Sequence, residues 1–170
     1  MLYYTNIDTP VRILGLVRDD ESLLRVYLPN EVISEQILQK YYPNIDFFEN
    51  KSGFEDTINQ LTEYFNGKRK VFNIKTKIGA SPFYKKVLAE VAKVPYGRTT
   101  SYSQIAQKLN NPKAARAVGT ANARNPLPII IPCHRIIAKN GNLGGYAGGL
   151  KMKKYLLEFE RNNLNSDEHD

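Results

Sequence analysis

Residues 100–122 read TSYSQIAQKLNNPKAARAVGTAN, and this stretch decides the fold of the second half of the chain. Ser101 and Gln104 have the spacing of a capping box, which predicts that a helix begins here. The segment Asn110-Asn111-Pro112 predicts a tight turn, and a second helix is expected from Lys113 to about Asn122. Two short helices across a three-residue turn are typical of a helix-turn-helix.

The second of these helices is rich in small residues, at positions 114, 115, 117, 119 and 121. Small side chains let a helix come close to another surface, which is either the protein core or a nucleic-acid groove. Core packing is the more common reason for such a pattern. Arg116 stands apart, because its guanidinium needs an acceptor, either a carboxylate of the protein or a phosphate or base of DNA.

The segments around this pair also carry helix and strand signals. Ser81-Pro82 predicts a helix start, with a side-chain cap followed by proline at the first helical position. Pro95-Tyr96-Gly97 ends that helix, and a last helix is expected from about Leu150 to Asn162. Three isoleucines at 129–131 predict a short buried strand that leads to Pro132-Cys133-His134-Arg135.

The first half of the chain has the pattern of an α/β scaffold without a catalytic pair. Residues 11–16 and 23–28 predict two strands of a hairpin, joined by a polar turn. Residues 30–40 and 52–66 have helical spacing, and Gly67 suits a C-terminal cap. The predicted fold is therefore an α/β N-terminal domain, residues 1–78, with a small sheet and helices. A mainly α-helical C-terminal domain with the helix-turn-helix follows at 79–170.

The charge is unevenly distributed between these halves. Residues 1–78 carry 10 Lys and Arg against 11 Asp and Glu, whereas residues 79–170 carry 14 against 6. Within 79–166 only 3 acids remain beside the 14 bases. Such a field attracts polyanions, of which nucleic acid is the most common in a cell, although a solvated basic surface is the alternative.

Composition excludes several classes of protein. A single cysteine, Cys133, rules out an internal disulfide scaffold and a cysteine-cluster zinc site, and the two histidines, His134 and His169, predict no metal site. No apolar run is long enough for a transmembrane helix, and the N-terminus does not resemble a secretory signal. These features together predict a cytoplasmic protein that does not bind membranes.

Cys133 is the candidate nucleophile, because a thiolate next to a base is the usual form of an activated cysteine. His134 and Arg135 follow it directly, whereas an inert core cysteine is the alternative. Downstream, residues 140–149 hold five glycines, which predict a loop whose Tyr146 could stack on a flat ligand or pack beneath the loop. Glu160 could pair with a lysine or orient a histidine.

Ile131-Pro132-Cys133-His134-Arg135-Ile136 resembles the active-site motif of the O6-alkylguanine-DNA alkyltransferases, also called methylated-DNA–protein-cysteine methyltransferases. The resemblance continues, in order and spacing, over about residues 80–160. It includes Val94–Gly97 with Ser101-Tyr102, and the segments 111–119, 125–128 and 145–150. In the first domain, Thr9-Pro10-Val11 fits the opening strand of the family, but Arg12 stands where many members have glycine.

The resemblance implies a role for each catalytic residue. Cys133 would accept the alkyl group, and His134 would act as its base through a bridging water, with Glu160 orienting the imidazole. Asn125 would sit at the turn before the active-site segment. Tyr102 would press on the phosphate beside the target nucleotide, help to rotate it out and protonate the leaving base.

The resemblance also implies how DNA is bound. The second helix would enter the minor groove, and Arg116 would fill the space left by the flipped nucleotide. The residues placed against DNA in this way are Ser101, Tyr102, Ala115, Arg116, Ala117, Gly119 and Arg124. Those placed around the flipped base are Arg135, Tyr146, Ala147 and Gly148. Ala147 stands where many members have a serine.

The function implied is DNA repair by irreversible transfer of the alkyl group from O6-alkylguanine, and from O4-alkylthymine, to Cys133. The protein would act once, as a monomer, on double-stranded DNA, with no cofactor, no metal and no obligate protein partner. Two alternatives remain open at this point. A non-catalytic lesion sensor would bind alkylated DNA without accepting the alkyl group, and a cysteine hydrolase would turn over repeatedly through an acyl intermediate.

Overall fold

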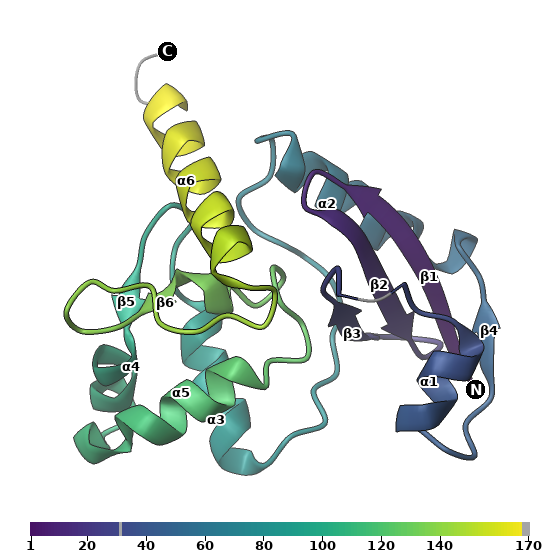
Figure 1. Cartoon of the computed structure of the whole chain (residues 1–170), viewed down its shortest axis with the longest axis horizontal. Coiled ribbons are helices and arrows are strands. Elements are labelled where there is room, and N and C mark those ends of the chain that lie inside the picture. The colour runs from purple at the N-terminus through teal and green to yellow at the C-terminus, as the bar shows by residue number, and fades with distance from the viewer. Residues whose placement is uncertain (31, 168–170) are drawn as a thin grey trace. The chain divides into compact units, whose positions relative to one another are not determined.

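The computed structural model describes residues 1–30 and 32–167 (Figure 1). The chain forms two compact units, with the boundary between Gly79 and Ala80. Residues 168–170 lie outside the described residues, and they include His169, one of the two histidines of the chain. In the described part of the chain, no helix combines the length and apolar character needed to cross a membrane.

The first unit is built on a four-stranded sheet. Its strands are β1 (Leu2–Thr9), β2 (Arg12–Arg18), β3 (Leu23–Tyr27) and β4 (Phe47–Glu49), in the order β3-β2-β1-β4. The pairs β1–β2 and β2–β3 are antiparallel, and the pair β2–β3 confirms the hairpin predicted from residues 11–16 and 23–28. The strand β4 runs parallel to β1. Neither β1 as a whole nor β4 was expected from its local sequence.

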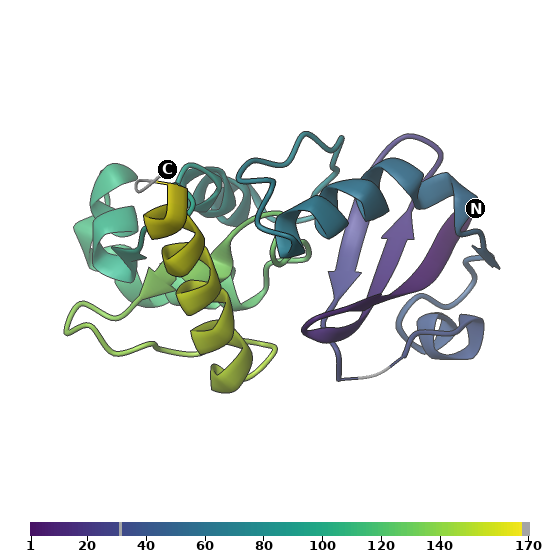
Figure 2. The same ribbon diagram turned by 90° about the horizontal axis from the view of Figure 1, so that it is seen from above.

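Two helices pack on opposite faces of this sheet (Figure 2). The first, α1 (Glu35–Tyr41), buries Leu38 against Tyr4, Val17 and Phe47. The second, α2 (Glu55–Phe65), follows a short 3-10 turn, η1 (Ser52–Phe54). The chain continues beyond α2 with Gly67 at a φ of 73°, and its N–H donates to the carbonyl of Tyr64, as expected for a helix-ending glycine.

The helix predicted from residue 30 begins five residues later. Ser34 caps α1, and its hydroxyl accepts a hydrogen bond from the backbone N–H of Ile37. Ile33 lies before the helix and packs against β2, where an added Cβ at Gly15 would come within 2.8 Å of the Ile33 side chain. The apolar spacing at 32–38 therefore mixes an extended segment with the first turn of a helix, which explains the error.

Arg12 occupies a position that favours glycine. Its φ is 82°, where a side chain costs about 1 kcal/mol or more, because Cβ approaches the backbone. Arg12→Gly is therefore expected to raise the free energy of unfolding by about 0.5–1 kcal/mol in urea denaturation. Arg25→Gly, in ordinary strand conformation on β3, should instead lower it. Equal losses in both variants would contradict the strain at Arg12.

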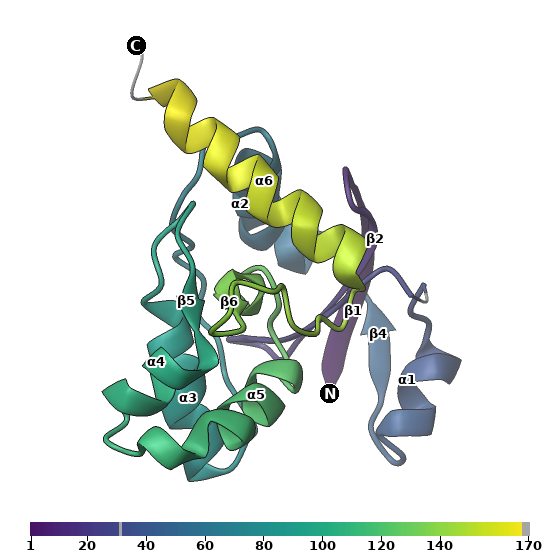
Figure 3. The same cartoon turned by 60° about the vertical axis from the view of Figure 1, so that its left-hand side comes forward.

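The second unit is mainly α-helical. Its elements are α3 (Pro82–Ala92), β5 (Thr100–Ser101), α4 (Tyr102–Lys108), η2 (Pro112–Ala114), α5 (Ala115–Ala123), η3 (Cys133–Arg135), β6 (Ile136–Ile137) and α6 (Leu150–Asp167). β5 and β6 form a short parallel pair. The helices α3, α4 and α5 group on one side of this pair, and α6 runs past the other (Figures 1 and 3).

Local signals explain where most of these helices begin. Ser81 caps α3, and the Ser101–Gln104 capping box opens α4 with both reciprocal hydrogen bonds present. The two helices separated by residues 109–114, α4 and α5, contact each other. The last helix is longer than predicted, since it continues to Asp167.

The strand predicted at 129–131 is wrong. These residues form a tight turn in which the N–H of Ile131 donates to the carbonyl of Leu127, and Ile129 has a φ of 73°. Asn125 fixes this turn, because its amide nitrogen donates to the carbonyl of Ile131 at 2.8 Å and its oxygen accepts from the N–H of Leu127 at 3.0 Å. The β-branched run fills the core as a turn instead of a strand.

Candidate active site

Cys133 lies in the wall of a cavity of about 500 Å³ in the second unit. The cavity is bounded by α4, α5, the turn at 125–133 and the glycine-rich loop. This loop connects β6 to α6 (Figure 1). Of the predicted site residues, the structure places Tyr102, Gly119, Asn125, Cys133, Tyr146 and Ala147 in this wall. Its size suits a small planar ligand.

His134, the residue after Cys133, forms a hydrogen-bonded relay with Glu160. The imidazole Nε2 of His134 lies 2.7 Å from Oε1 of Glu160, and both side chains are fully buried. Burial alone would raise the pKa of Glu160, but the hydrogen bonds from His134 and Arg135 outweigh it and hold the pKa at about 2. Glu160 is therefore a carboxylate at neutral pH and can only accept, so His134 Nε2 carries a proton.

The second ring nitrogen of His134 is left as the basic one. Burial lowers the pKa of His134, although Glu160 acts in the opposite direction, so the imidazole is neutral at pH 7. In a neutral imidazole only one nitrogen bears hydrogen, which leaves a lone pair on Nδ1. Within residues 1–30 and 32–167, this buried Nδ1 has no hydrogen-bond partner. The relay therefore holds a base ready to take a proton.

Glu160 is held by two further groups besides His134. Arg135 donates to both carboxylate oxygens, at 2.8 and 2.9 Å, and the N–H of Gly97 donates to Oε2 at 3.1 Å. Gly97 has a φ of 71°, and a Cβ there would lie 2.9 Å from the Leu164 side chain. Glycine is thus required for this close approach between the segment after α3 and α6.

The structure corrects the predicted place of Arg135. Its guanidinium turns to Glu160 and donates to the carbonyl of Val94 at 2.7 Å, and it is 5% exposed. A buried guanidinium needs a counter-charge and several acceptors, and Glu160 and Val94 supply them. Arg135 is therefore a support of the relay and not a wall of the base cavity. Gly148 is also placed outside the residues that line the cavity.

The thiol of Cys133 is strongly protonated in the resting protein. Burial raises its pKa to about 11, although the Asn125 amide, the Lys153 charge and the backbone N–H groups of Cys133 and His134 lower it. A thiol with this pKa is a poor nucleophile at pH 7. Any reaction of the thiol therefore needs its proton removed, and His134, with its basic Nδ1, lies in the same 3-10 turn, η3.

Lys153 is a buried cation near the thiol. Its side chain on α6 is fully buried, and Nζ donates to the backbone carbonyls of Ile136, Leu143 and Gly145. Burial lowers the pKa of Lys153 to about 8, while the Cys133 charge raises it, so the amine is still mainly protonated at pH 7. Lys153 therefore ties the glycine-rich loop to β6 and favours negative charge on sulfur.

Two tyrosines, Tyr102 and Tyr146, line the cavity. Burial and the Cys133 charge raise the pKa of the half-buried Tyr102, which keeps its hydroxyl protonated and able to donate. Gly144, with a φ of 70°, lets the loop approach Tyr102, since a Cβ there would lie 2.7 Å from the phenol oxygen. Burial also raises the pKa of Tyr146, whose buried hydroxyl has no partner among the described residues.

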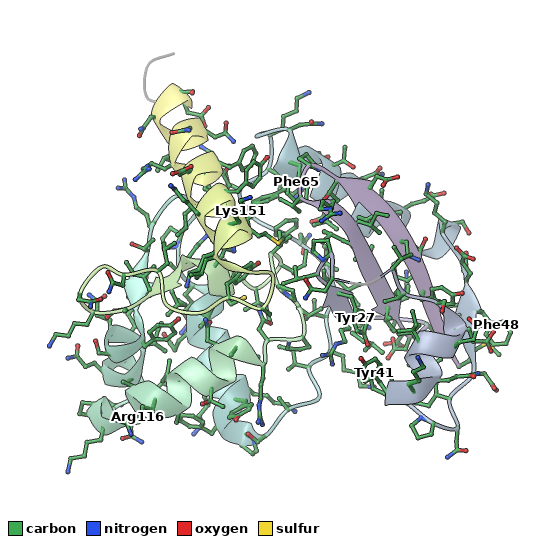
Figure 4. The ribbon with its side chains drawn as sticks, viewed as in Figure 1. Tyr27, Tyr41, Phe48, Phe65, Arg116 and Lys151 are labelled. Atoms are coloured by element: carbon green, nitrogen blue, oxygen red, sulfur yellow. The ribbon has the colours of Figure 1, made fainter. Side chains whose placement is uncertain are left out.

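The predicted DNA-contacting residues are mostly accessible on α5. Arg116, Ala117 and Arg124 are exposed, and Ala115 and Gly119 are partly exposed. Figure 4 shows Arg116 on the surface of α5. Ser101 differs, since it is 7% exposed and its hydroxyl caps α4 and lies 3.0 Å from the Ser103 hydroxyl. Its position assigns Ser101 to holding the helix start, and not to the surface offered to DNA.

Three residues of the site were missed in the sequence. Lys153 lies in a run of lysines that reads as solvated, although its spacing of three from Leu156 and seven from Glu160 places it on their buried face. Asn122 looked like the end of a helix, and Gly97 like a simple helix stop. Among the described residues, no group of three or more His, Cys, Asp and Glu side chains could hold a metal ion.

Comparison with known proteins finds the same family for both units. The model for the 6-O-methylguanine DNA methyltransferase DNA-binding domain matches residues 82–162, and that for its ribonuclease-like domain matches residues 2–78. A methylated-DNA–protein-cysteine methyltransferase of Methanosarcina mazei is 42% identical over 163 residues, covering 96% of this chain and 99% of the relative. The constitutive enzyme of that name from Bacillus subtilis is 39% identical over 168 residues, covering 95% and 96%.

A solved structure shares the fold over nearly the whole chain. The crystal structure of Mycobacterium tuberculosis OGT in complex with DNA has a TM-score of 0.85 and 34% sequence identity, and covers 95% of this chain and 94% of that one. The expected family and fold class are thereby confirmed. With both domains matched, and with relatives of such identity along its length, the chain belongs to the 6-O-methylguanine DNA methyltransferase family.

Proposed function

We propose that this protein repairs DNA by transferring the alkyl group of O6-alkylguanine to the sulfur of Cys133, once per molecule. The observation that carries the proposal is the hydrogen bond between His134 and Glu160: Glu160 fixes the proton on His134 Nε2 and leaves Nδ1 basic in the residue that directly follows Cys133, which lines the cavity. The names of the relatives, methylated-DNA–protein-cysteine methyltransferases, support the same activity.

The chemistry needs a proton to leave sulfur and a proton to reach the base. His134 Nδ1 takes the thiol proton through a bridging water, and the sulfur attacks the alkyl carbon as the bond from that carbon to guanine O6 breaks. The electron pair of that bond passes to the purine, and Tyr102 protonates the purine. The imidazolium then passes its proton to the Tyr102 phenolate. In the net reaction sulfur loses one proton, guanine gains one, both His134 and Tyr102 return to their starting forms, and sulfur keeps the carbon as a thioether.

A thioether is not hydrolysed in water at neutral pH, and the described residues of the cavity offer no group that would remove the alkyl group. Asn125 holds the turn that presents Cys133, and Glu160 orients the imidazole. Tyr146 and Ala147 line the cavity and would lie over the base. The absence of a serine hydroxyl at Ala147 removes one hydrogen bond that many family members offer to guanine O6.

We propose that α5 enters the minor groove of double-stranded DNA and that the damaged nucleotide rotates into the cavity. The small and exposed residues of α5 permit this close approach, and the strong excess of bases over acids in 79–166 favours binding to phosphates. Arg116 fills the space in the stack, and Arg124 lies beside the groove. Residues 79–170 thus hold the DNA-binding surface and the active site, with residues 1–78 as scaffold.

The decisive test is the intact mass of the protein after incubation with a duplex that contains one O6-methylguanine. A gain of one methyl group, mapped to Cys133 and lost in Cys133→Ser, is expected. A protein that binds the duplex with unchanged mass would be a lesion sensor instead. Repeated turnover on esters or amides would indicate a hydrolase. Cys133→Ser that still cleared the lesion would reject the proposed nucleophile.

Arg116→Ala is expected to slow methyl transfer from duplex DNA by about 10- to 100-fold, because base rotation without a side chain in the stack costs a few kcal/mol more. Its reaction with free O6-benzylguanine should change by less than about twofold, since no stack is opened. Lys151→Ala removes an equal charge from the start of α6 (Figure 4) and serves as the control. Equal losses on both substrates would reject the flipping role of Arg116.

A further inference from the structure

Asn122 lies in the last turn of α5. Among the described residues, its side-chain nitrogen has a hydrogen-bond partner and its side-chain oxygen has none. The side chain is 5% exposed, and Nδ2 donates to the backbone carbonyl of Cys133 at 3.2 Å. Because a carbonyl oxygen only accepts, the nitrogen must face Cys133, and the orientation of the amide is determined. The oxygen Oδ1 is buried and, among the residues that the structure describes, has no hydrogen-bond partner.

A buried acceptor without a donor is unusual and calls for an explanation. Most buried polar atoms in folded proteins are paired, since an unpaired one loses its hydrogen bonds to water without replacement. Asn122 lines the same cavity as Cys133, Tyr102 and Tyr146. A donor supplied by the molecule that fills this cavity would satisfy Oδ1.

The two bases expected as substrates differ in what they can donate. In O6-alkylguanine, N1, N3, N7 and O6 are all acceptors, and the 2-amino group is the only N–H donor left once N9 carries the sugar. In O4-alkylthymine, O2, N3 and O4 are acceptors, and N3 has no hydrogen. An unpaired acceptor in the wall therefore has a partner on the purine and none on the pyrimidine.

We propose that Asn122 is a specificity-determining residue, whose Oδ1 accepts a hydrogen bond from the 2-amino group of the flipped O6-alkylguanine and thereby favours guanine over thymine. This inference rests on the proposed function, because it concerns the same cavity and the same nucleophile. The hydrogen bond from Nδ2 to the Cys133 carbonyl fixes the orientation of the amide, so that Oδ1 is the atom available to accept from the 2-amino group. Tyr102, as a donor, meets the acceptor atoms of the same base.

The purely structural alternative is that Asn122 only supports the Cys133 backbone. Both roles would slow the reaction of an Asn122 variant, so a rate alone does not separate them. If Asn122 had only a structural role, its substitution would slow the reaction with all substrates alike. If Oδ1 accepts from the 2-amino group, the substitution would slow only the reaction with substrates that carry this group. The ratio between two substrates that differ by this group is therefore the informative measurement.

The experiment compares three duplexes that are identical except for the target base: O6-methylguanine, O6-methylhypoxanthine, which lacks the 2-amino group, and O4-methylthymine. Methylation of Cys133 is followed by intact mass in the wild type and in Asn122→Leu. The wild type is expected to react about tenfold faster with O6-methylguanine than with O6-methylhypoxanthine. In Asn122→Leu this ratio should fall to within about twofold, and the preference over O4-methylthymine should fall with it.

Free bases remove any effect of duplex stability on the ratio. O6-benzylguanine and 6-benzyloxypurine, which differ by the same amino group, should show the same change between the wild type and Asn122→Leu. Thr120→Val, an exposed position on the same helix, is the matched control and should keep the wild-type ratio. Asn122→Ala is a second variant in case the leucine disturbs folding.

The outcomes separate the two proposals. An unchanged ratio in both Asn122 variants, or equal rates of the wild type with O6-methylguanine and O6-methylhypoxanthine, would overturn the role of Asn122 and leave the transfer reaction standing. A wild-type protein whose Cys133 gains no methyl group from any of the three duplexes would overturn the proposed function and this inference together.

Discussion

Glu160→Gln is expected to slow alkyl transfer by about 10²- to 10⁴-fold and to lower the free energy of unfolding by about 3–5 kcal/mol. The rate falls because a neutral amide no longer fixes the proton on His134 Nε2. Stability falls because Arg135 remains buried without its counter-charge. Intact-mass time courses and urea denaturation measure the two effects.

The pH dependence of stability gives a second readout for the same variant. The folded-state pKa of Glu160, about 2, lies below its ordinary value of 4.5. Its contribution to stability is therefore fully present above about pH 5 and is lost as the pH falls from about 4.5 toward 2. The difference in stability between the wild type and Glu160→Gln should shrink over that range.

Glu158→Gln supplies the matched control for this variant. Glu158 lies on the same helix, its side chain is 47% exposed, and its nearest cation, Lys154, is 3.9 Å away. Such an exposed pair contributes little, so stability should change by less than about 0.5 kcal/mol and the transfer rate should be unaffected. If Glu160→Gln behaved like this control, the relay would have no part in the reaction.

Lys153→Met is expected to lower the free energy of unfolding by about 2–4 kcal/mol and to slow alkyl transfer at least about tenfold. Methionine keeps most of the apolar stem but leaves three backbone carbonyls without their donor. The glycine-rich loop then loses its tie to β6, and the developing charge on sulfur loses a nearby cation. Hydrogen exchange at residues 143–147 should accelerate.

Lys154→Met, one residue further along α6, provides the comparison for Lys153. Its amine is exposed and, among the described residues, forms the long ion pair to Glu158, so both stability and loop exchange should stay close to the wild type. Unchanged exchange at 143–147 in Lys153→Met would show that the loop is held by other contacts. The two variants differ in burial and not in chemistry, which isolates the buried amine.

The parts of the fold that were predicted depend on local chemistry. The capping box at Ser101 and Gln104 and the Ser81-Pro82 start are read within four residues, and both helices begin there. Signals of this kind do not require knowledge of the rest of the chain.

The errors arise where side-chain or tertiary contacts override the local preference of a segment. The isoleucines at 129–131 have a strong strand preference, yet the Asn125 side chain closes them into a turn. The short strand β4 exists only because it pairs with β1, more than forty residues earlier in the sequence. Strand propensity does not register the Asn125 hydrogen bonds, and the pairing of β4 with β1 is a tertiary contact.

The candidate site shows the same division. Cys133 and His134 could be proposed as nucleophile and base from their chemistry, and Glu160 could be proposed only with two partners left open. The structure places the Glu160 carboxylate against His134 and Arg135. The inward position of Lys153 and the unpaired oxygen of Asn122 depend on burial, which a single sequence does not reveal.

The depth at which the sulfur lies has a consequence for the useful lifetime of the molecule. A protein that reacts only once would lose its activity if its thiol first reacted with an oxidant or a small electrophile. Both kinds of reagent attack the ionised form of a thiol. Because Cys133 is held as the neutral thiol, with a pKa of about 11, it is poorly reactive while the molecule waits. In the proposed reaction, the thiol would ionise only when a damaged nucleotide occupies the cavity.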